Sequence, residues 1–316
     1  MVKHKSATRG RPTGEPEFLA SLRRRVLLPR RSQIVAGIGD DCAVFRPRGS
    51  SDDLLFTTDL LIEGTHFLRA THTPEDAGWK ALARGLSDIA AMGGTPCFCL
   101  ASLALAPWST TRWADRFFEG LLDLAQRETT PLIGGDLART DRVLCDIVVA
   151  GSVPRGTALR RDGAHAGDAI FVSGELGGSA FGLQTRRGPA WKRHKRPEPR
   201  MALGRFLRER AGATAAMDLS DGLSLDLYRL CAASGLRAEI GPPPIFPGAT
   251  LDHALHGGED YELLFTAAAS TRVPADFEGL RLTRIGTMRR GEPGRIDLDG
   301  VLLPRRGWDH LAAPLE

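Results

Sequence analysis

The sequence predicts a mixed α/β protein of two domains, and three observations support this fold class. Its 316 residues are enough for two domains of ordinary size. Apolar residues make up 42% and charged residues 25% of the chain, which is close to the average for folded proteins and excludes wholesale disorder. From residue 34 onward, short apolar runs typical of strands alternate with longer amphipathic stretches typical of helices.

The first domain is predicted to span residues 15–153, after a disordered basic tail at 1–14 that is rich in Lys, Arg, Pro and Gly. It begins with a short helix ending near Pro29, because apolar residues recur at helical spacing before that proline. Further strands are predicted at 54–57, 97–105 and 143–153, and helices at 79–89 and 112–127.

The second domain is predicted to span residues 154–316. Residues 154–168 are rich in Gly, Arg and Asp and lack apolar periodicity, so the boundary is expected there. A strand at 169–173, a basic loop and a second series of elements follow. This series has a helix from Met201, a strand at 214–217, a helix at 222–233, a strand at 261–266 and a β-rich end.

Two short segments carry most of the positive charge. Residues 1–31 contain nine Lys or Arg and two Glu, and residues 186–200 contain seven Lys or Arg and one Glu, although the whole chain is only +4. The rest of the chain is therefore net negative. The segment 186–200 resembles a nucleic-acid patch or a nuclear localisation signal. We interpret it instead as a solvated surface loop and expect no nucleic-acid partner.

The cysteines and the apolar runs indicate the compartment. Five scattered cysteines with no C-x-x-C pair argue against a disulfide framework and against a zinc site, and we expect reduced core thiols. No apolar run approaches the length of a membrane span, and the first 30 residues carry charges where a signal peptide needs an apolar region. The expected location is cytoplasmic, with no membrane partner.

An aspartate follows small or hydroxyl residues at the end of an apolar run in five places. A short carboxylate beside Gly, Ser or Thr suits a hard divalent cation such as Mg²⁺, which often bridges carboxylates to substrate phosphates. Any single junction is more simply a turn or a helix cap, but five together favour a metal–phosphate site holding several ions. The junctions are G-I-G-D-D at 37–41, T-T-D at 57–59, S-D at 87–88, G-G-D at 134–136 and D-L-S-D-G at 218–222.

The familiar nucleotide-binding signatures are missing. The sequence contains no G-x-x-x-x-G-K-[ST], no G-x-G-x-x-G after a predicted strand and no H-R-D or D-F-G. A nucleotide would therefore have to bind in a way that differs from P-loop, Rossmann and protein-kinase proteins.

The ordered set of motifs resembles the thiamine-monophosphate kinase family, within the superfamily of aminoimidazole ribonucleotide synthetase. The resemblance covers nearly the whole chain from about residue 15 onward. Its segments are G-I-G-D-D-C-A at 37–43, T-T-D-L-L-x-E-G-T-H-F at 57–67, L-S-D-I-A-A-M-G at 86–93, L-I-G-G-D at 132–136, A-L-R-R-D-G-A at 158–164, R-H-K-R-P-E-P-R at 193–200, D-L-S-D-G-L at 218–223, G-G-E-D-Y-E-L at 257–263 and R-G-W-D-H at 306–310.

The resemblance implies a fold, a reaction and a set of site residues. The fold is a two-domain unit whose N-terminal domain pairs with its twin in a dimeric barrel. The reaction is direct transfer of the γ-phosphate of ATP to thiamine monophosphate with several Mg²⁺ ions, in which neutralisation and alignment matter more than a general base. The implied Mg²⁺ shell is Asp41, Thr57, Thr58, Asp59, Asp88, Asp136, Asp218 and Asp221. The implied ATP contacts are Gly135, Asp136, Arg161 and Ser220, with Phe118 near the adenine, and the implied substrate contacts are His66, Glu259 and Trp308. Catalysis is expected to depend on Asp59, Asp136, Arg161 and Asp221.

Plainer interpretations exist for several of these residues. His66 can be a satisfied strand-end histidine, Trp308 can fill the core, and Arg161 can belong to a solvated, salt-bridged loop. Two other functions also stay open: a sister ATP-dependent synthetase of the same superfamily, and a nucleic-acid-binding protein that uses the two basic segments.

Overall fold

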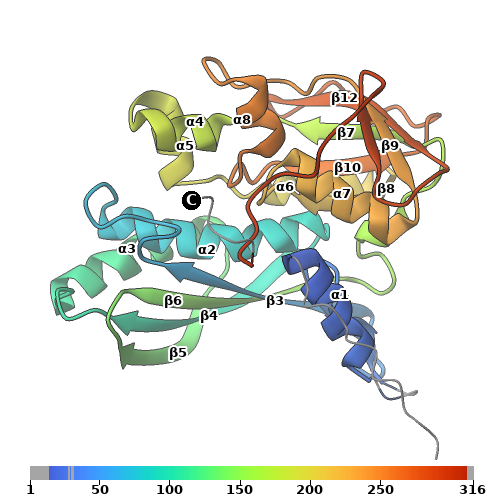
Figure 1. Cartoon of the computed structure of the whole chain (residues 1–316). Coiled ribbons are helices and arrows are strands. Elements are labelled where there is room, and N and C mark those ends of the chain that lie inside the picture. Colours follow the sequence, from blue (N-terminus) through green and yellow to red (C-terminus); the bar gives the residue numbers. More distant parts are fainter. Residues whose placement is uncertain (1–13, 28, 30–31, 312–316) are drawn as a thin grey trace, which may run out of the picture.

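The computed structural model describes residues 14–27, 29 and 32–311, and its strands form two sheets stacked with helices between them (Figure 1). The predicted basic tail at 1–14 lies, except for Gly14, outside the described residues. The first sheet has the strand order β1-β2-β3-β6-β4-β5. These strands are β1 (Ile34–Ala36), β2 (Ala43–Phe45), β3 (Asp52–Ile62), β4 (Thr95–Leu105), β5 (Leu132–Arg139) and β6 (Leu144–Pro154). Two helices, α2 (Pro74–Ala91) and α3 (Thr111–Arg127), cover one face of this sheet.

The second sheet has the order β14-β13-β9-β12-β7-β10-β8, with β11 paired to β12. Its strands are β7 (Ala169–Ser173), β8 (Ala213–Asp218), β9 (Arg237–Ile240), β10 (Leu263–Ala267), β11 (Asp276–Phe277), β12 (Leu280–Arg289), β13 (Ile296–Leu298) and β14 (Val301–Leu302). Its helices are a 3₁₀ turn η1 (Arg161–Gly163), α4 (Gly178–Thr185), α5 (Gly188–Lys195), α6 (Met201–Glu209), α7 (Leu223–Ser234) and α8 (Leu251–His256).

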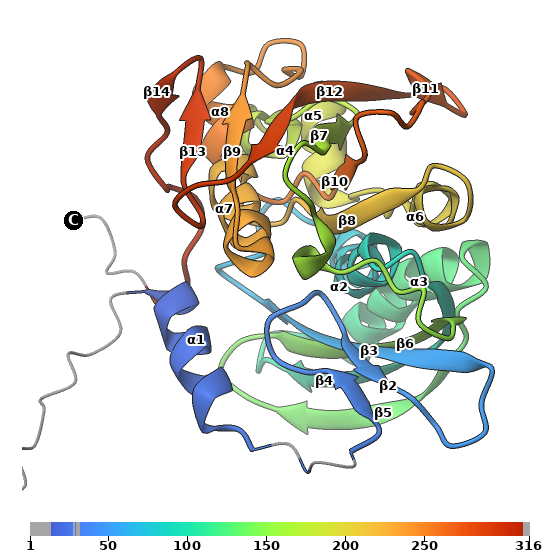
Figure 2. The same cartoon turned by 90° about the vertical axis from the view of Figure 1, so that its right-hand side faces the viewer.

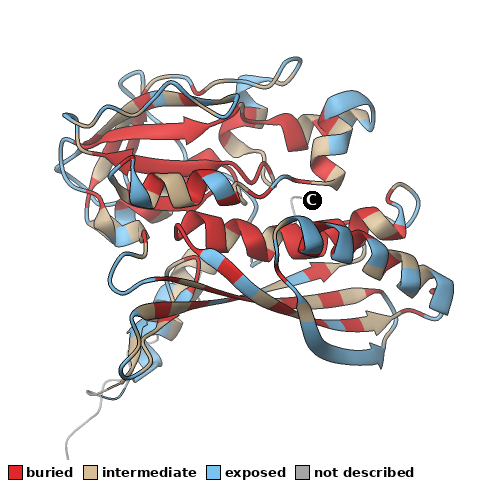
Figure 3. Cartoon of the chain, turned by 180° about the vertical axis from the view of Figure 1, so that it is seen from behind, coloured by how far each residue is buried: buried red, intermediate tan, exposed pale blue. Residues whose placement is uncertain are grey.

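Helix α2 joins the two halves because it packs on both of them. A capping box between Thr73 and Asp76 and a proline at its first position start the helix. It contacts β3 and β6 of the first sheet as well as α6 and β8 of the second half, and it is buried along almost its whole length (Figure 3). Two glycines allow close approach: a Cβ at Gly78 would lie 1.8 Å from the carbonyl oxygen of Phe117 on α3, and Gly85 lies against Val149 of β6.

The other face of the first sheet is open. Along β3 the buried residues alternate with exposed ones, and the exposed set includes the large apolar side chains of Phe56 and Leu60. The outermost strand β5 is exposed over nearly all of its length, with Ile133 at 59% and Leu137 at 67% of full exposure (Figure 3). This side of the molecule therefore presents an apolar face and an unpaired strand edge.

The N-terminal end of a first helix, α1 (Glu15–Arg25), contacts the second half of the molecule. The backbone N–H of Glu15 donates to the carboxylate of Asp309 at 3.0 and 3.1 Å, and Arg305 pairs with Glu17 at 2.7 Å. Figure 2 shows α1 beside the red segment that follows β14. Asp309 thus satisfies an N–H group that the start of a helix leaves free.

Most predicted elements are confirmed, including the mixed α/β class. Several details differ: helices α4 and α8 were not predicted, and β3 is longer than the strand predicted at 54–57. The first helix ends at Arg25, the basic loop contains helix α5, and Cys97 is exposed while the other four cysteines are buried free thiols. Residues 155–168 connect the two sheets, and the domain limits drawn at 153 and 154 stay a prediction. Within the described residues, no helix has both the length and the apolarity of a membrane span.

Candidate active site

A cavity of about 290 Å³ lies between the two halves of the molecule. Helix α2, strand β3, helix α4 and the loops after β8 and before β10 contribute its walls, together with the segment after β14. Of the predicted site residues, those that line it are Asp59, His66, Asp88, Asp218, Ser220, Asp221, Glu259 and Trp308.

Three carboxylates from separate parts of the chain meet at one side of this cavity. Asp41 follows β1, Asp88 lies on α2 and Asp218 ends β8, and one oxygen of each lies within 4.8 Å of the others. Thr57 donates to Asp88, and Ser87 donates to Asp218 at 2.6 Å. We call Asp41, Asp88 and Asp218 the carboxylate cluster.

Burial and mutual repulsion make the carboxylate cluster costly without a cation. Burial raises the pKa of Asp88 well above its usual value, and the charges of Asp59 and Asp218 raise it further. Burial and then Asp41 do the same to the pKa of Asp218. Packed carboxylate oxygens with raised pKa values are the donor set that hard divalent cations neutralise, so the residues present fit Mg²⁺.

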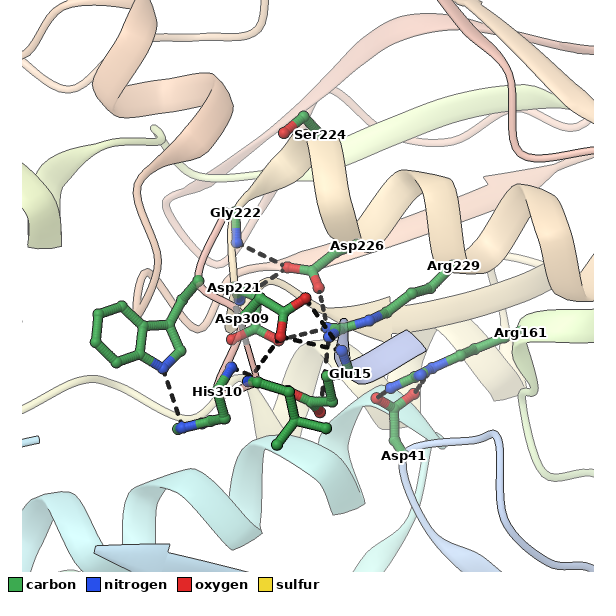
Figure 4. A network of polar contacts seen from close by, with 12 residues as sticks. Glu15, Asp41, Arg161, Asp221, Gly222, Ser224, Asp226, Arg229, Asp309 and His310 are labelled. Atoms are coloured by element: carbon green, nitrogen blue, oxygen red, sulfur yellow. Dashed lines mark hydrogen bonds and ion pairs between the residues drawn. The ribbon is translucent and has the colours of Figure 1, made fainter. Parts of the chain in front are cut away.

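Arg161 and Asp221 extend this acidic side. The guanidinium of Arg161 forms a bidentate pair with Asp41, so Arg161 lies beside the cluster and not in a solvated loop. Asp221 pairs with Arg229 of α7, which also holds Asp226 at 2.9 Å (Figure 4). The backbone N–H groups of residues 221 and 222 both donate to Asp226 at 3.0 Å, which fixes the loop that carries Asp221.

The segment after β14 completes the rim near Asp221. The backbone N–H of Trp308 donates to the carbonyl of Asp221 at 3.0 Å, and the indole Nε1–H of Trp308 donates to His310 at 3.2 Å. Trp308 is 51% exposed at the rim of the cavity, so it does not fill the core.

The opposite side of the cavity is organised around Glu259. Its Oε1 lies 2.7 Å from Nζ of Lys80, a lysine with no exposed surface, and its Oε2 lies 3.5 Å from Nδ1 of His194. Burial raises the pKa of Glu259, but the charges of Lys80, His194 and Arg84 and the hydrogen bond from Lys80 together outweigh burial and lower that pKa to about 2. Glu259 is therefore an ionised carboxylate that already has its counter-ion.

His66 is held as a neutral ring. The backbone N–H of Ile62 donates to its Nδ1 at 2.9 Å, and burial, with Arg84 nearby, lowers its pKa to about 3. The proton of the neutral ring is then on Nε2, which leaves His66 one donor for a ligand.

Four predicted residues do not join the cavity within one chain. Gly135 and Asp136 lie on β5 and line a separate hollow with Phe118 of α3. Strands β6 and β4 separate β5 from β3. Thr58 points to the exposed face of β3, where it donates to Asp146 at 2.6 Å. Thr57, by contrast, touches the carboxylate cluster through Asp88.

Two functional residues of α2 were not predicted from the sequence: Arg84 lines the cavity, and the buried Lys80 pairs with Glu259. A signal was present, because Lys80, Arg84 and Asp88 repeat every four residues on a helix whose other residues are mostly apolar. Charges at this spacing share one face of a helix. They are ionisable residues in the middle of a mostly buried helix, and such residues need partners.

The interpretation of 186–200 as a solvated basic loop is correct only in part: Arg186, Arg187 and Lys192 are exposed, but the basic residues from Arg193 onward are engaged in ion pairs. Arg193 and Arg200 pair with the buried Glu262, and Lys195 and Arg196 pair with Asp76 at the start of α2. These charges tie α5 to both halves of the molecule, because each finds a carboxylate that burial would otherwise leave unpaired.

Comparisons with known proteins agree with this geometry. Residues 39–153 match the family model "AIR synthase related protein, N-terminal domain". The chain is 39% identical to the thiamine-monophosphate kinase of Rhodopirellula baltica over 86% of its own length and 88% of the relative. It is 38% identical to the thiamine-monophosphate kinase of Escherichia coli (strain K12) over 90% of its own length and 94% of the relative. A solved structure described as "AaThiL complexed with AMPPCP and TMP" superposes with a TM-score of 0.83 at 32% identity, covering 97% of this chain and all of that one.

Proposed function

The chain belongs to the thiamine-monophosphate kinase family, and we propose that it transfers the γ-phosphate of ATP to thiamine monophosphate in the cavity between its two sheets. The products are thiamine diphosphate and ADP. The observation that carries this function is a contrast between the two sides of the cavity. On one side lies the carboxylate cluster, in which only Asp41 pairs with a cation, Arg161. On the other side lies Glu259, whose negative charge is balanced by Lys80.

On the acidic side, Asp41, Asp88 and Asp218 are proposed to hold Mg²⁺ together with Asp59 and Asp221. When bound, Mg²⁺ neutralises phosphate charge and aligns the two reacting groups. Thr57 and Ser87 orient the carboxylates through the hydrogen bonds described above. Arg161 adds a fixed positive charge beside Asp41 for the nucleotide phosphates.

On the opposite side, Glu259 is proposed to face the cationic part of thiamine monophosphate. Its counter-ion Lys80 keeps it ionised and fixed, and neutral His66 offers a hydrogen-bond donor. The exposed ring of Trp308 offers a surface for stacking on the heterocycle. The acceptor phosphate is ionised at neutral pH, so none of these groups needs to act as a strong base.

We also propose that the enzyme is a homodimer that joins the open faces of two first sheets. The exposed apolar residues of β3 and β5 support this pairing, because a large apolar face on a monomer is unfavourable in water. Asp136, Gly135 and Phe118, which lie away from the cavity of their own chain, would then contribute to a site shared between copies.

A mixing experiment tests the shared site. Asp59→Asn and Asp136→Asn are each expected to be inactive alone, and co-refolded mixtures should regain activity because mixed dimers contain one intact site. Recovery absent from a verified mixed dimer would mean that each chain completes its own site.

A cytoplasmic location and the absence of a nucleic-acid partner complete the proposal. Buried free thiols support a reducing compartment. The ion pairs that engage Arg193, Lys195, Arg196 and Arg200 leave little free charge in 193–200 for phosphates of nucleic acid.

A chromatographic assay tests the reaction itself. Purified protein with thiamine monophosphate, ATP and Mg²⁺ should form thiamine diphosphate and ADP in equal amounts, and EDTA should stop both. Formation of ADP without thiamine diphosphate, or no turnover by folded protein that binds Mg–ATP, would overturn the assignment of the acceptor.

A further inference from the structure

Arg84 occupies the border between the two sides of the cavity. It lies on α2 one turn from both Lys80 and Asp88, and its side chain is only 11% exposed. Asp59, Glu259 and Tyr261 line the cavity together with Arg84. No sequence motif pointed to this residue.

The guanidinium of Arg84 has donors to spare. One Nη2–H donates to Asp59 at 2.8 Å and one Nη1–H donates to the carbonyl of Leu60 at 3.2 Å. Its Nε is buried and meets no acceptor in residues 14–27, 29 and 32–311. An arginine has five N–H donors and stays protonated, so an unmatched buried Nε is costly unless a ligand supplies the acceptor.

The neighbouring anions do not meet this need. Glu259 is compensated by Lys80 at 2.7 Å, and Asp59 already pairs with Arg84 and is also a proposed metal ligand. A metal ion on Asp59 would compete for the same carboxylate and leave Arg84 with still fewer acceptors. An anion that enters the cavity beside Arg84 would accept from the Nη N–H groups that Asp59 and Leu60 leave free.

We propose that Arg84 binds the phosphate of thiamine monophosphate and so distinguishes the phosphorylated substrate from thiamine. The inference rests on the proposed function, since the acceptor phosphate must lie where the substrate side meets the nucleotide side. The planar guanidinium suits two phosphate oxygens at once. Lys80 does not compete for this role, because it is engaged with Glu259 and with the carbonyl of His66.

Equilibrium binding of two ligands tests the proposal. Calorimetry measures the Kd of thiamine monophosphate and of thiamine for wild type, Arg84→Met and Arg84→Lys, in Mg²⁺ and in EDTA. Arg84→Met should raise the Kd of thiamine monophosphate about 10- to 100-fold and leave the Kd of thiamine unchanged. The reason is that the lost hydrogen bonds are made to the phosphate, which thiamine lacks. The Kd of thiamine monophosphate for Arg84→Lys should lie between these values, because lysine keeps the positive charge but lacks the planar guanidinium that binds two oxygens at once.

Arg116→Met is the matched control. Arg116 lies on α3 and forms a bidentate pair with Glu75 of α2 outside the cavity, so its loss removes an arginine–carboxylate pair without touching the site. This variant should bind both ligands as wild type does. In steady-state kinetics, Arg84→Met should raise KM for thiamine monophosphate and leave KM for ATP unchanged.

Equal weakening of both ligands in Arg84→Met and Arg84→Lys would overturn the proposal and make Arg84 a brace for β3. So would a wild-type protein that binds thiamine as tightly as thiamine monophosphate. Failure of the proposed function appears elsewhere, as a wild-type enzyme that forms no thiamine diphosphate.

Discussion

The two sides of the cavity use the same kind of residue in opposite ways. On the acidic side, Asp88 and Asp218 are buried beside other carboxylates and their pKa values are raised. On the substrate side, Glu259 lies beside a buried lysine and its pKa falls to about 2. This difference shows that the charges of neighbouring side chains, and not the residue type, decide whether a buried carboxylate needs a bound cation or is already a stable anion.

Asp218→Asn is the test of this contrast with the largest expected effect. It should lower kcat by about 10²- to 10³-fold, because preorganised charge at the reacting groups is lost. In EDTA the same variant should raise the melting temperature, because one repelling carboxylate is gone. The chromatographic assay measures kcat and calorimetry measures the melting temperature, and Asp123→Asn on the exposed face of α3 is the control. A lower melting temperature with intact kcat would contradict the account of the acidic side.

Lys80→Met tests the compensated side. Removing the counter-ion leaves the Glu259 charge unpaired, and we expect a loss of about 3 kcal/mol in the free energy of unfolding measured in urea. The double variant Lys80→Met/Glu259→Gln should recover most of it, since no charge is then left without a partner. Equal losses in the single and double variants would show that the pair is not the source of the stability.

Lower pH should reduce the free energy of unfolding through the neutral histidines on the substrate side of the cavity. Burial lowers the pKa of His66 and of His194 to about 3, so between pH 6.5 and 3 the unfolded chain binds more protons than the folded one. Stability from these residues is therefore present above pH 6.5 and lost as the pH falls, by about 2 kcal/mol for each at pH 5. Urea unfolding at pH 7 and pH 5 measures it. His194→Gln should flatten the dependence, and an equally steep slope in that variant would exclude His194 as a cause.

His66→Ala should have the smallest effect. Because His66 is expected to offer one hydrogen bond to bound substrate, KM for thiamine monophosphate should rise about 10-fold with little change in kcat. Steady-state kinetics with saturating ATP measures this, with the exposed His165→Ala as control. A KM equal to that of wild type would remove His66 from the substrate site.

The sequence predicts the acidic side better than the compensated side. Asp junctions at strand ends have a local pattern, so the order of residues along the chain is enough to single out Asp41, Asp88 and Asp218. Lys80 and Arg84 share a helix face with Asp88, which the sequence shows, but only the tertiary packing of α2 shows which groups their charges contact. The same holds for 186–200, where the carboxylates that pair with the basic residues lie far away in the chain.

The strand order also limits how well sequence motifs predict which residues share a site. Asp59 and Asp136 both follow small or hydroxyl residues, yet β3 and β5 are separated by two strands in the sheet. Position in the sheet depends on nonlocal pairing, which no local spacing encodes. A shared role for the two residues therefore requires either a second chain or a larger rearrangement, and the dimer is the simpler proposal.

The contact between Glu15 and Asp309 has a consequence for biosynthesis. Helix α1 leaves the ribosome well before the residues that hold its N-terminus, because Arg305 and Asp309 are made almost 300 residues later. Domains generally fold as units during synthesis, whereas this helix must wait for the last strand and the segment that follows it. The rim that Trp308 forms at the cavity therefore closes late, so a nascent chain cannot complete its substrate pocket until synthesis has passed residue 309.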